Sequence, residues 1–403
     1  MPVSLRKILY FDTTGRGGGA STSLRTLLLE LDRRVYSPVL VFGDRGNAHR
    51  WREEEVYEFS YAGFDNFDFF PAGWNLRWLF HMSRFIAHFP VDAVRTALLL
   101  HRIRPALVHI NAGQAVTFGL TARLMGYPVV WHVRELVVRN LFGGLLDRLY
   151  RFCSRCIIAP SKAVASRLPR CASKLLIIPN GVRIPSPREA LEDEFRRAMG
   201  IREGDFVVLL LGHKLDLLKG YLFLADVARR LASLDRLFFL LAGHEEDPPV
   251  PPYHSFFRRV YRLRSGGRGE KEFIKNRWED LTKRRKAVFT GYIDPQIAIA
   301  ASTVVVCPNQ AAESFGRTVI EAYAQAKPVI AMDLPALNEL VIDDVTGWLL
   351  PPDVADWVTL IDSLCRNPEK IRLAAGEALK RSSLYSAALH ARRVENLYGS
   401  ILG

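Results

Sequence analysis

The stretch Glu313-Ser-Phe-Gly-Arg-Thr-Val-Ile-Glu321 places two carboxylates eight residues apart, with Gly316 between them. Glycine is unfavourable inside a helix, so we expect a loop that becomes a helix after Phe315. Free N–H groups at a helix start favour an anion such as a phosphate, and nearby carboxylates can accept hydrogen bonds from sugar hydroxyls. The stretch therefore indicates a nucleotide-sugar pocket. The alternative, from spacing alone, is a solvated helix face that carries two glutamates.

The length and composition of the chain indicate a soluble globular protein of two domains. It has 403 residues, of which 49% are hydrophobic and 24% charged, and one ordinary core does not organise a chain of this length. We find no apolar run of about 18 residues and no secretory signal. Five cysteines make no disulfide framework, which predicts a cytoplasmic protein. Cys153 and Cys156 form a lone C-x-x-C and are expected to be core residues.

Strands and helices alternate along the chain, which predicts parallel sheets covered by helices on both faces. Strands are expected at 7–12, 37–42, 107–111, 129–132, 156–159 and 174–178, and again at 206–211, 237–242, 287–290, 303–307 and 328–332. Helices are expected at 21–31, 145–153 and 221–234, with two helical stretches in 74–103. The expected fold is α/β, with two doubly wound Rossmann-like domains that face each other across a cleft.

Pro185-Ser-Pro187 precedes a charged helix and is expected to mark the domain boundary. The expected division is an acceptor-side domain at 1–185 and a nucleotide-sugar-binding domain at 186–380. The remaining residues, 381–403, are expected to form a helix that packs back on the first domain.

The loop Gly15-Arg-Gly-Gly-Gly19-Ala20 follows the first strand and can be written as the dinucleotide fingerprint G-x-G-x-x-A. That fingerprint needs an acidic residue about 20 residues further on, and Asp44 lies 29 residues after Gly15. We therefore favour a glycine-rich turn that brings the backbone close to a ligand over a nicotinamide or flavin site. Ser21 or Ser23 is expected to cap the following helix.

Basic and aromatic residues are mixed between Pro251 and Lys286, where twelve lysines and arginines face four acids. The aromatic residues are Tyr253, Phe256, Phe257, Tyr261 and Trp278. This composition suits an anionic membrane surface or an anionic acceptor, and we expect no nucleic acid because no recognised binding module surrounds it. The alternative is a solvated loop without a partner. The stretch from Trp74 to Met82 is read either as a second membrane element or as a buried amphipathic helix.

A set of short motifs along nearly the whole chain resembles one enzyme family. In order they are Gly18-Gly19-Ala20, Val130-Trp-His132-Val-Arg-Glu135, Ala159-Pro-Ser161, Ile178-Pro-Asn-Gly181-Val, Leu211-Gly212, Lys219-Gly220, Leu241-Ala-Gly243, Phe289-Thr-Gly291-Tyr, Glu313–Glu321, Pro328-Val-Ile, Asn338-Glu339 and Thr346-Gly347. The chain resembles the retaining GT-B glycosyltransferases of the large family-4-like group, which includes sucrose synthases and bacterial lipid mannosyltransferases.

The resemblance implies roles for individual residues. Lys219 matches the lysine that holds the donor diphosphate, Glu313 the carboxylate that faces the transferred sugar, and Glu321 the carboxylate that accepts from the ribose hydroxyls. His132 matches a strand-end histidine near the sugar and the acceptor; the alternative is an ordinary core or capping histidine. The implied donor-binding residues are Gly18, Gly19, Gly212, His213, Lys214, Ser314, Phe315, Gly316, Arg317, Thr318 and Glu321.

The resemblance also implies the reaction: transfer of a hexose from a nucleotide sugar to a lipid-linked or polysaccharide acceptor, with retention of anomeric configuration. It implies no metal, no cofactor beyond the nucleotide-sugar co-substrate and no dedicated protein nucleophile. The expected location of the reaction is the cytoplasmic face of a membrane. Many members carry Gly-Arg where this chain has Gly212-His213-Lys214, and a Gly-Gly pair near Leu334-Pro335-Ala336. A 245–286 insertion is a further departure. The alternatives are an inactive binding or regulatory subunit and a related epimerase or phosphorylase.

Overall fold

The computed structural model describes residues 5–12, 19–42, 58–61, 76–111, 113, 115–184, 189–244 and 269–403. The chain divides into two compact units. Unit 1 comprises Met1–Val182 and Tyr385–Gly403, and unit 2 comprises Arg183–Leu384. The final helix therefore belongs to the same unit as the amino-terminal part of the chain. No described helix is both long and apolar enough to cross a lipid bilayer.

Unit 1 contains a parallel sheet of seven strands in the order β3-β2-β1-β4-β5-β6-β7. The strands are β1 (Arg6–Asp12), β2 (Tyr36–Phe42), β3 (Glu58–Tyr61), β4 (Leu107–Ile110), β5 (Val129–His132), β6 (Cys156–Ala159) and β7 (Leu175–Ile177). The central strands β4, β5 and β6 are buried at every position, as expected for a parallel sheet covered on both faces.

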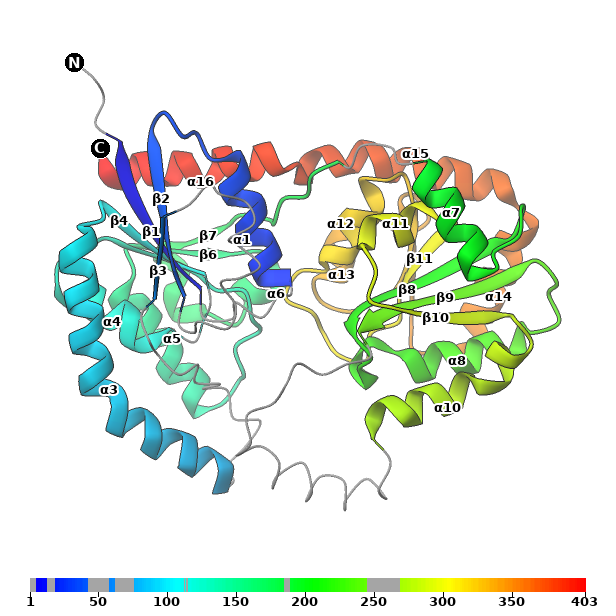
Figure 1. Cartoon of the computed structure of the whole chain (residues 1–403), viewed down its shortest axis with the longest axis horizontal. Coiled ribbons are helices and arrows are strands. Elements are labelled where there is room, and N and C mark those ends of the chain that lie inside the picture. Colours follow the sequence, from blue (N-terminus) through cyan, green and yellow to red (C-terminus); the bar gives the residue numbers. More distant parts are fainter. Residues whose placement is uncertain are drawn as a thin grey trace. The chain divides into compact units, whose positions relative to one another are not determined.

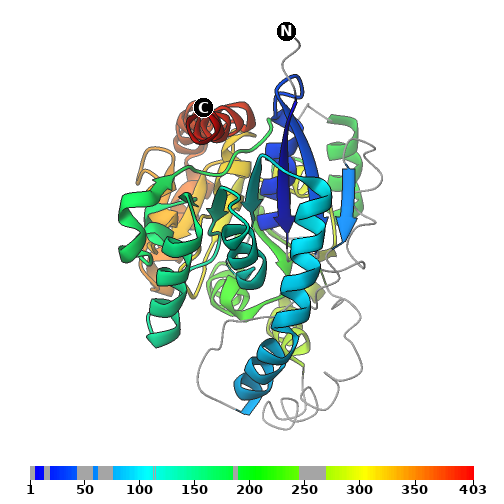
Figure 2. The same ribbon diagram turned by 90° about the vertical axis from the view of Figure 1, so that its left-hand side faces the viewer.

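Helices cover both faces of this sheet (Figures 1 and 2). One face carries α3 (Leu76–Ile103), α4 (Val116–Leu124) and α5 (Leu141–Cys153), and the other carries α1 (Gly19–Glu30) and α16 (Ala387–Leu402). The shorter α6 (Lys162–Ala165) and η2 (Pro169–Lys174) precede β7. Alternate side chains of β1 point to opposite faces of the sheet. Leu9 packs in the core beneath α3, α4 and α5, and Tyr10 packs in the core beneath α1 and α16.

Two local expectations for unit 1 are wrong. The two helical stretches expected in 74–103 are one helix, α3, which contains Pro90. Proline has no backbone N–H, so one hydrogen bond of the helix is lost, but here the helix continues past it. Ser21 and Ser23 do not cap α1, which begins at Gly19. Inside the helix, Ser21 Oγ donates to Asp12 Oδ2 at 2.9 Å and Ser23 Oγ donates to the Gly19 carbonyl at 2.7 Å.

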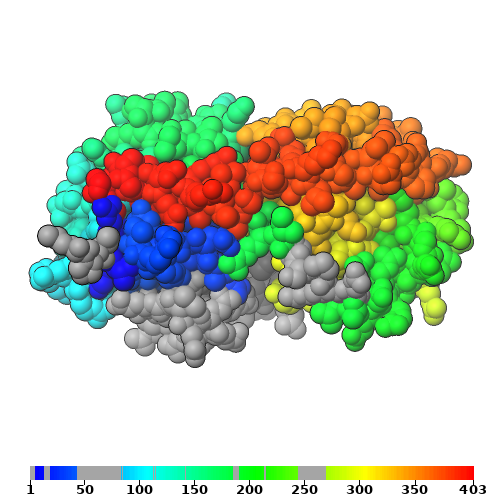
Figure 3. Space-filling model, turned by 90° about the horizontal axis from the view of Figure 1, so that it is seen from above, coloured from blue at the N-terminus to red at the C-terminus, as the bar shows by residue number. Residues whose placement is uncertain are grey.

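The helix α16 forms one wall of the unit 1 core. Its Ala391, Val394 and Tyr398 are buried in the cluster that contains Leu24 and Leu28 of α1. Figure 3 shows α16, in red, lying against the blue residues of α1 on this face of unit 1. The Tyr398 hydroxyl also donates to the hydroxyl of Tyr10 on β1 at 3.1 Å. Helix α16 therefore covers one face of the sheet that the amino-terminal part of the chain forms.

Unit 2 contains a parallel sheet of six strands in the order β10-β9-β8-β11-β12-β13. The strands are β8 (Phe206–Lys214), β9 (Leu237–His244), β10 (Ala287–Gly291), β11 (Val304–Cys307), β12 (Val329–Met332) and β13 (Gly347–Leu350). The helices are α7 (Glu189–Met199), α8 (Tyr221–Arg230), α10 (Glu270–Lys283), α11 (Pro295–Ala300), α12 (Arg317–Tyr323), α13 (Leu337–Leu340), α14 (Val354–Arg366) and α15 (Pro368–Ser382), with turns η3 (Leu217–Lys219) and η5 (Ser383–Tyr385). Side chains of α8, α10 and α14 share one core with the sheet. The expected doubly wound α/β fold is confirmed in both units.

Helix α10 corrects part of the expectation for the basic stretch 251–286. Residues 251–268 lie outside the described residues. Trp278, however, is fully buried on α10, and its Nε1 donates to the Tyr221 carbonyl at 2.9 Å. Two basic residues near the end of the helix pair with carboxylates on it, Lys283 with Glu279 at 2.6 Å and Arg284 with Asp280 at 3.0 Å. The reading of Trp278 as part of an exposed basic and aromatic surface is therefore wrong.

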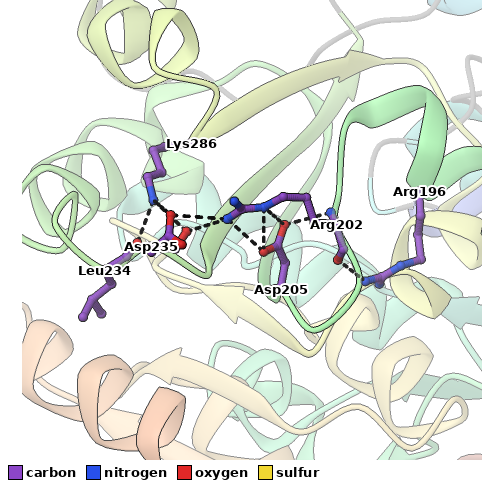
Figure 4. Close-up of polar contacts among 6 residues, drawn as sticks. All are labelled: Arg196, Arg202, Asp205, Leu234, Asp235 and Lys286. Atoms are coloured by element: carbon purple, nitrogen blue, oxygen red, sulfur yellow. Dashed lines mark hydrogen bonds and ion pairs between the residues drawn. The ribbon is translucent and has the colours of Figure 1, made fainter.

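The amino ends of β8, β9 and β10 are joined by a polar network (Figure 4). Arg202 donates to the Asp235 carbonyl at 2.8 Å and contacts the carboxylate of Asp205 at 3.2 Å. Lys286 donates to the carbonyls of Leu234 at 2.8 Å and Asp235 at 2.7 Å. Lys286, the last residue of the expected basic stretch, thus holds two strand connections together.

Candidate functional site

The two loops that follow β8 and β11 meet at the carboxyl edge of the unit 2 sheet. β8 pairs with β9 on one side and with β11 on the other, so the strand order reverses between β8 and β11. Ligands of doubly wound sheets bind beyond the carboxyl ends of the strands at such a reversal. Lys219, in the turn η3 after β8, and Glu313, in the loop after β11, both lie there.

A close backbone contact fixes the position of the Lys219 turn. Gly220 follows Lys219 with φ 82°, and an added Cβ at Gly220 would lie 1.9 Å from the Pro308 carbonyl oxygen. The Gln310 amide donates to the Leu218 carbonyl at 2.8 Å, and the Asp216 carboxylate caps the turn by accepting from the Leu218 amide at 2.9 Å. Only glycine fits at position 220, and these contacts hold the turn after β8 against the loop after β11.

Lys219, Glu313 and Asn309 form a polar cluster. The ammonium of Lys219 forms an ion pair with Glu313 Oε1, which also accepts from Asn309 Nδ2 at 2.6 Å. The Lys219 and Glu313 side chains are 36% and 21% exposed, so a ligand can reach them. Burial alone would lower the pKa of Lys219, but the neighbouring Glu313 carboxylate outweighs it and the pKa is raised. Lys219 is therefore a fixed cation at neutral pH.

A second ion pair lies where the loop becomes helix α12. Arg317 Nε donates to Glu321 Oε1 at 2.6 Å, and the two side chains are 15% and 20% exposed. Gly316 precedes the helix with φ 89°, a backbone conformation that favours glycine, and a Cβ there would lie 2.9 Å from Leu337 Cδ2. Phe315 is buried and anchors the turn. The expected change from loop to helix after Phe315 is confirmed.

The remaining expected donor-binding residues of unit 2 lie on the same two loops or on β8. Ser314 and Thr318 are partly buried beside Glu313 and Arg317 in the sequence. Gly212, His213 and Lys214 form the last three residues of β8, but the side chains of His213 and Lys214 lie outside the described residues. The structure therefore places Lys219, Glu313 and Asn309 together, and Arg317 with Glu321.

In unit 1, His132 ends β5 within a buried histidine cluster. Its ring is 0% exposed, and neither ring nitrogen has a hydrogen-bond partner among the described residues. The ring centroids of His109 and His390 lie 5.6 and 6.2 Å from that of His132. His109 Nδ1 and the Tyr398 hydroxyl are 2.6 Å apart, and His390 Nδ1 lies 2.7 Å from the Pro179 carbonyl oxygen.

Burial lowers the pKa of His132 and of His109 well below the ordinary value, and the charge of Arg134 adds to the effect. Desolvation disfavours the charged imidazole, and a nearby cation disfavours it further. Both rings are therefore neutral at physiological pH. A neutral His132 can accept or donate one hydrogen bond at each ring nitrogen, depending on its tautomer.

Sequence reasoning missed a buried arginine beside this cluster. Arg134 Nε donates to Asn111 Oδ1 at 2.7 Å, and another guanidinium nitrogen of Arg134 donates to Asn180 Oδ1. Asn111 follows β4, and Asn180 follows β7. The available signal was positional, since each of these polar residues lies one to three residues after the end of an apolar strand, where ligand-contacting residues of parallel sheets lie.

The glycine-rich loop of unit 1 is described only in part. Gly18 lies outside the described residues, and Gly19 is the exposed first residue of α1. An added Cβ at Gly19 would have no heavy atom within 4 Å. Asp12, fully buried at the end of β1, accepts from Ser21 and so ties the start of α1 to the strand. Within the described residues, no cluster of three histidines, cysteines or carboxylates has the arrangement of a metal site.

Comparison with known proteins agrees with this architecture. The family profile described as Glycosyl transferases group 1 matches residues 192–381, and the profile Glycosyltransferase Family 4 matches residues 17–184. A phosphatidyl-myo-inositol mannosyltransferase of Mycobacterium leprae is 30% identical over 142 residues, which is 34% of this chain and 37% of the relative. A D-inositol 3-phosphate glycosyltransferase of Corynebacterium kroppenstedtii is 38% identical over 101 residues, which is 24% of this chain and 22% of the relative. The matched regions thus span well under half of these relatives.

Solved structures match over nearly the whole chain. The Anabaena protein Alr3699/HepE, crystallised with UDP and glucose, has a TM-score of 0.76 at 19% identity, covering 98% of this chain and 100% of that one. Sucrose-phosphate synthase of Thermosynechococcus elongatus has a TM-score of 0.70 at 18% identity, covering 98% and 99%. At this level of identity the likeness is one of fold, and the fold is GT-B.

Proposed function

We propose that this chain, which belongs to the family-4-like glycosyltransferases of the GT-B fold, transfers a hexose from a nucleotide sugar to a lipid-linked or polysaccharide acceptor. The observation that carries the proposal is the ion pair of Lys219 and Glu313 at the strand-order reversal of unit 2. It supplies a fixed cation and a carboxylate, partly exposed and side by side, where a doubly wound sheet binds its ligand.

Lys219 would stabilise the diphosphate of the donor. Its ammonium carries three N–H donors, of which Glu313 takes one, so further donors remain for phosphate oxygens. The negative charge on the diphosphate grows as the bond to the sugar breaks. A cation placed in advance therefore stabilises the transition state more than the ground state. Glu313, held by Lys219 and Asn309, would accept hydrogen bonds from hydroxyls of the transferred sugar.

Glu321 would bind the nucleotide through the ribose hydroxyls. Its Oε1 accepts from Arg317 Nε, and its side chain is partly exposed. A carboxylate has about four acceptor positions, so the ion pair with Arg317 leaves room for two hydroxyl donors. Arg317 would orient this carboxylate and offset its charge beside the donor phosphates.

The proposed stereochemistry is retention of the anomeric configuration, and the proposed acceptor side is unit 1. The acceptor hydroxyl would attack on the face from which the nucleotide leaves, through a short-lived oxocarbenium-like species, and no protein nucleophile is needed. His132, which is fully buried in unit 1, would then contribute a neutral imidazole on the acceptor side. The mannosyltransferase and inositol glycosyltransferase names of two relatives support an acceptor that bears a lipid or a polyol. A cytoplasmic location at a membrane surface is part of the same proposal.

The test is a panel of nucleotide sugars, measured first by thermal shift and then by transfer. A ligand at 100 times its dissociation constant stabilises the folded protein by about 2.7 kcal/mol, which is easily detected. Stabilisation by one donor, followed by transfer to an acceptor, supports the proposal. Stabilisation without transfer to any acceptor favours a regulatory subunit, and turnover that requires inorganic phosphate favours a phosphorylase. No stabilisation by any nucleotide sugar contradicts the proposal.

A further inference from the structure

Glu135, which ends the motif Val130–Glu135, carries a carboxylate outside the donor site of unit 2. It lies three residues after β5, at the carboxyl edge of the unit 1 sheet. In this sheet the strand order reverses between β1 and β4, since β1 pairs with β2 on one side and with β4 on the other. The carboxylate reaches the loop after β4, where its Oε2 accepts from the Gly113 amide at 3.0 Å. Glu135 therefore lies beside the position where a doubly wound sheet binds its ligand.

Backbone amides hold this carboxylate on one side only. Oε2 accepts from the amides of Gly113 at 3.0 Å and Arg134 at 3.2 Å. Within the described residues Glu135 makes no ion pair, and neither of these two hydrogen bonds uses Oε1. The side chain is partly exposed. An ionised carboxylate has about four acceptor positions, so Oε1 keeps room for about two donors that come from a ligand.

The folded chain removes much of the water around Glu135 without supplying a cation in contact with it. Burial raises the pKa of Glu135, and the amides of Gly113 and Arg134 and the charge of Arg134 offset part of that rise. The Arg134 guanidinium itself donates to Asn111 Oδ1 at 2.7 Å and to Asn180 Oδ1. Desolvating a carboxylate costs free energy unless hydrogen bonds replace the lost water. Carboxylates with this combination of features are concentrated at functional sites.

A buried tyrosine fixes the peptide that Glu135 contacts. The Tyr150 hydroxyl donates to the Gly113 carbonyl at 2.6 Å, and Tyr150 is fully buried on α5. Its ring packs against Trp131 of β5, with 4.8 Å between the ring centroids. Gly113 is thus held through its carbonyl by Tyr150 and through its amide by Glu135. The position of the carboxylate is therefore set by buried packing, as a binding site for a small ligand requires.

We propose that Glu135 binds the acceptor, with Oε1 accepting hydrogen bonds from one or two hydroxyls of a sugar or polyol ring. The inference rests on the proposed function, which assigns the acceptor side to unit 1, and it adds a residue that recognises the acceptor. Hydroxyls are the fitting ligand because Oε1 offers acceptor positions only. A phosphate group of an acceptor would meet a like charge here, so it would lie away from Glu135.

Glu135→Gln separates acceptor binding from a purely structural tie between the two loops. The amide side chain can keep both backbone hydrogen bonds through its carbonyl oxygen, so the loops stay joined. Its NH2 group then donates at the position where Oε1 accepts. The matched control is Glu395→Gln. Glu395 is a partly exposed residue of unit 1 whose Oε1 accepts from the Asp32 amide at 2.6 Å. Asp32 precedes β2, at the opposite, amino edge of the sheet.

The first readout is transfer from the donor that the thermal-shift panel identifies. The acceptor probes are octyl α-D-mannopyranoside, octyl β-D-glucopyranoside and myo-inositol. We expect Glu135→Gln to raise the acceptor KM by roughly 10- to 100-fold, because a hydrogen bond to a charged group is lost. The donor dissociation constant should stay unchanged in this variant. Glu395→Gln should change neither quantity.

Deoxy analogues of the best of these acceptors give a readout that a structural role would not affect. Each hydroxyl other than the attacking one is replaced by hydrogen in turn. We expect at least one replacement to raise KM by about 10-fold in the wild type and little in Glu135→Gln, because both changes remove the same hydrogen bond. Tyr150→Phe keeps the ring but releases the Gly113 carbonyl, and it should raise the acceptor KM several-fold with donor binding unchanged. Thermal melts show whether each variant is folded, and Tyr150→Phe carries the test if Glu135→Gln is not.

Three results would overturn the proposal: an unchanged acceptor KM in Glu135→Gln, an equal rise in Glu395→Gln, or additive effects of Glu135→Gln and every deoxy analogue. Wild-type protein that binds donor but glycosylates none of the three probes would also overturn it, while the donor site would stand. Absence of binding by any nucleotide sugar contradicts the proposed function itself, and the inference falls with it.

Discussion

Lys219 and Glu313 lie 94 residues apart in the sequence, and their side chains form an ion pair at the carboxyl edge of the unit 2 sheet. One comes from the turn after β8 and the other from the loop after β11. The backbone contact between Gly220 and the Pro308 carbonyl keeps these two loops together. The pair is therefore built by the fold, and its effect on the proposed reaction can be tested one residue at a time.

Glu313→Gln keeps the shape of the side chain and its hydrogen bond from Asn309 but removes the charge. We expect kcat to fall by roughly 10- to 100-fold, because the variant loses a charged acceptor for sugar hydroxyls and the anchor of Lys219. Donor affinity should change less, since removing a negative charge near the diphosphate offsets part of the loss. Separate measurements of kcat and of the donor dissociation constant check this; an unchanged kcat removes Glu313 from the reaction.

Glu321→Ala should weaken donor binding while the protein stays folded. A hydrogen bond to a charged group contributes about 1.5–3 kcal/mol, so the donor dissociation constant should rise by roughly 10- to 100-fold. Calorimetric titration measures it. Glu377→Ala is the matched control, because Glu377 also forms an ion pair on a unit 2 helix, with Lys380 at 2.7 Å. The role of Glu321 fails if its variant and the control bind donor equally well.

Gly220→Ala should destabilise the protein more than Gly200→Ala. Both glycines have positive φ, 82° and 74°, but only a Cβ at Gly220 would clash, at 1.9 Å from the Pro308 oxygen. The strained conformation alone costs about 1 kcal/mol or more. We expect at least about 2 kcal/mol beyond that for Gly220→Ala, together with weaker donor binding because Lys219 moves. Urea denaturation measures both variants, and equal losses would show that the contact with Pro308 is not tight.

The stability of unit 1 should decrease as the pH falls below about 6.5. His132 and His109 have lowered pKa values in the folded protein, so they stay neutral there while unfolded histidines take up protons. The unfolded state then binds more protons, and the free energy of unfolding falls by up to about 1.4 kcal/mol per pH unit for each histidine. Denaturation between pH 7 and 5 measures the slope, which His132→Gln should reduce. His88→Gln removes an exposed imidazole as a control, and an equal reduction there would contradict the assignment.

The strands and the doubly wound order could be predicted from the sequence because the information is local. Parallel strands buried on both faces are continuous apolar runs, and Val129–His132 or Cys156–Ala159 stand out without any partner being known. The loop-to-helix change at Phe315-Gly316 was predictable for the same reason, since glycine at a positive φ marks it. Short edge strands such as β3 and β13 carry a weaker signal and were not predicted.

Features that depend on distant parts of the chain could not be predicted. Trp278 lies among basic residues in the sequence, yet its side chain is buried because α10 packs on α8. The histidine cluster combines β4, β5 and α16, with His390 some 260 residues beyond His132. The contacts of Arg134 with Asn111 and Asn180 join three strand ends. Each of these depends on which elements become neighbours, and local sequence patterns do not contain that.

Calorimetric titration of a nucleotide sugar into the wild-type chain, Lys219→Ala and Lys283→Ala tests the central claim most directly. Lys283 is the matched control because its ammonium also forms an ion pair, with Glu279 at 2.6 Å, away from the site. We predict that the wild type and Lys283→Ala bind the donor alike and that Lys219→Ala binds it at least about 10-fold more weakly. Equal affinity in all three proteins, or no binding by any, would contradict a nucleotide-sugar site at Lys219 and Glu313.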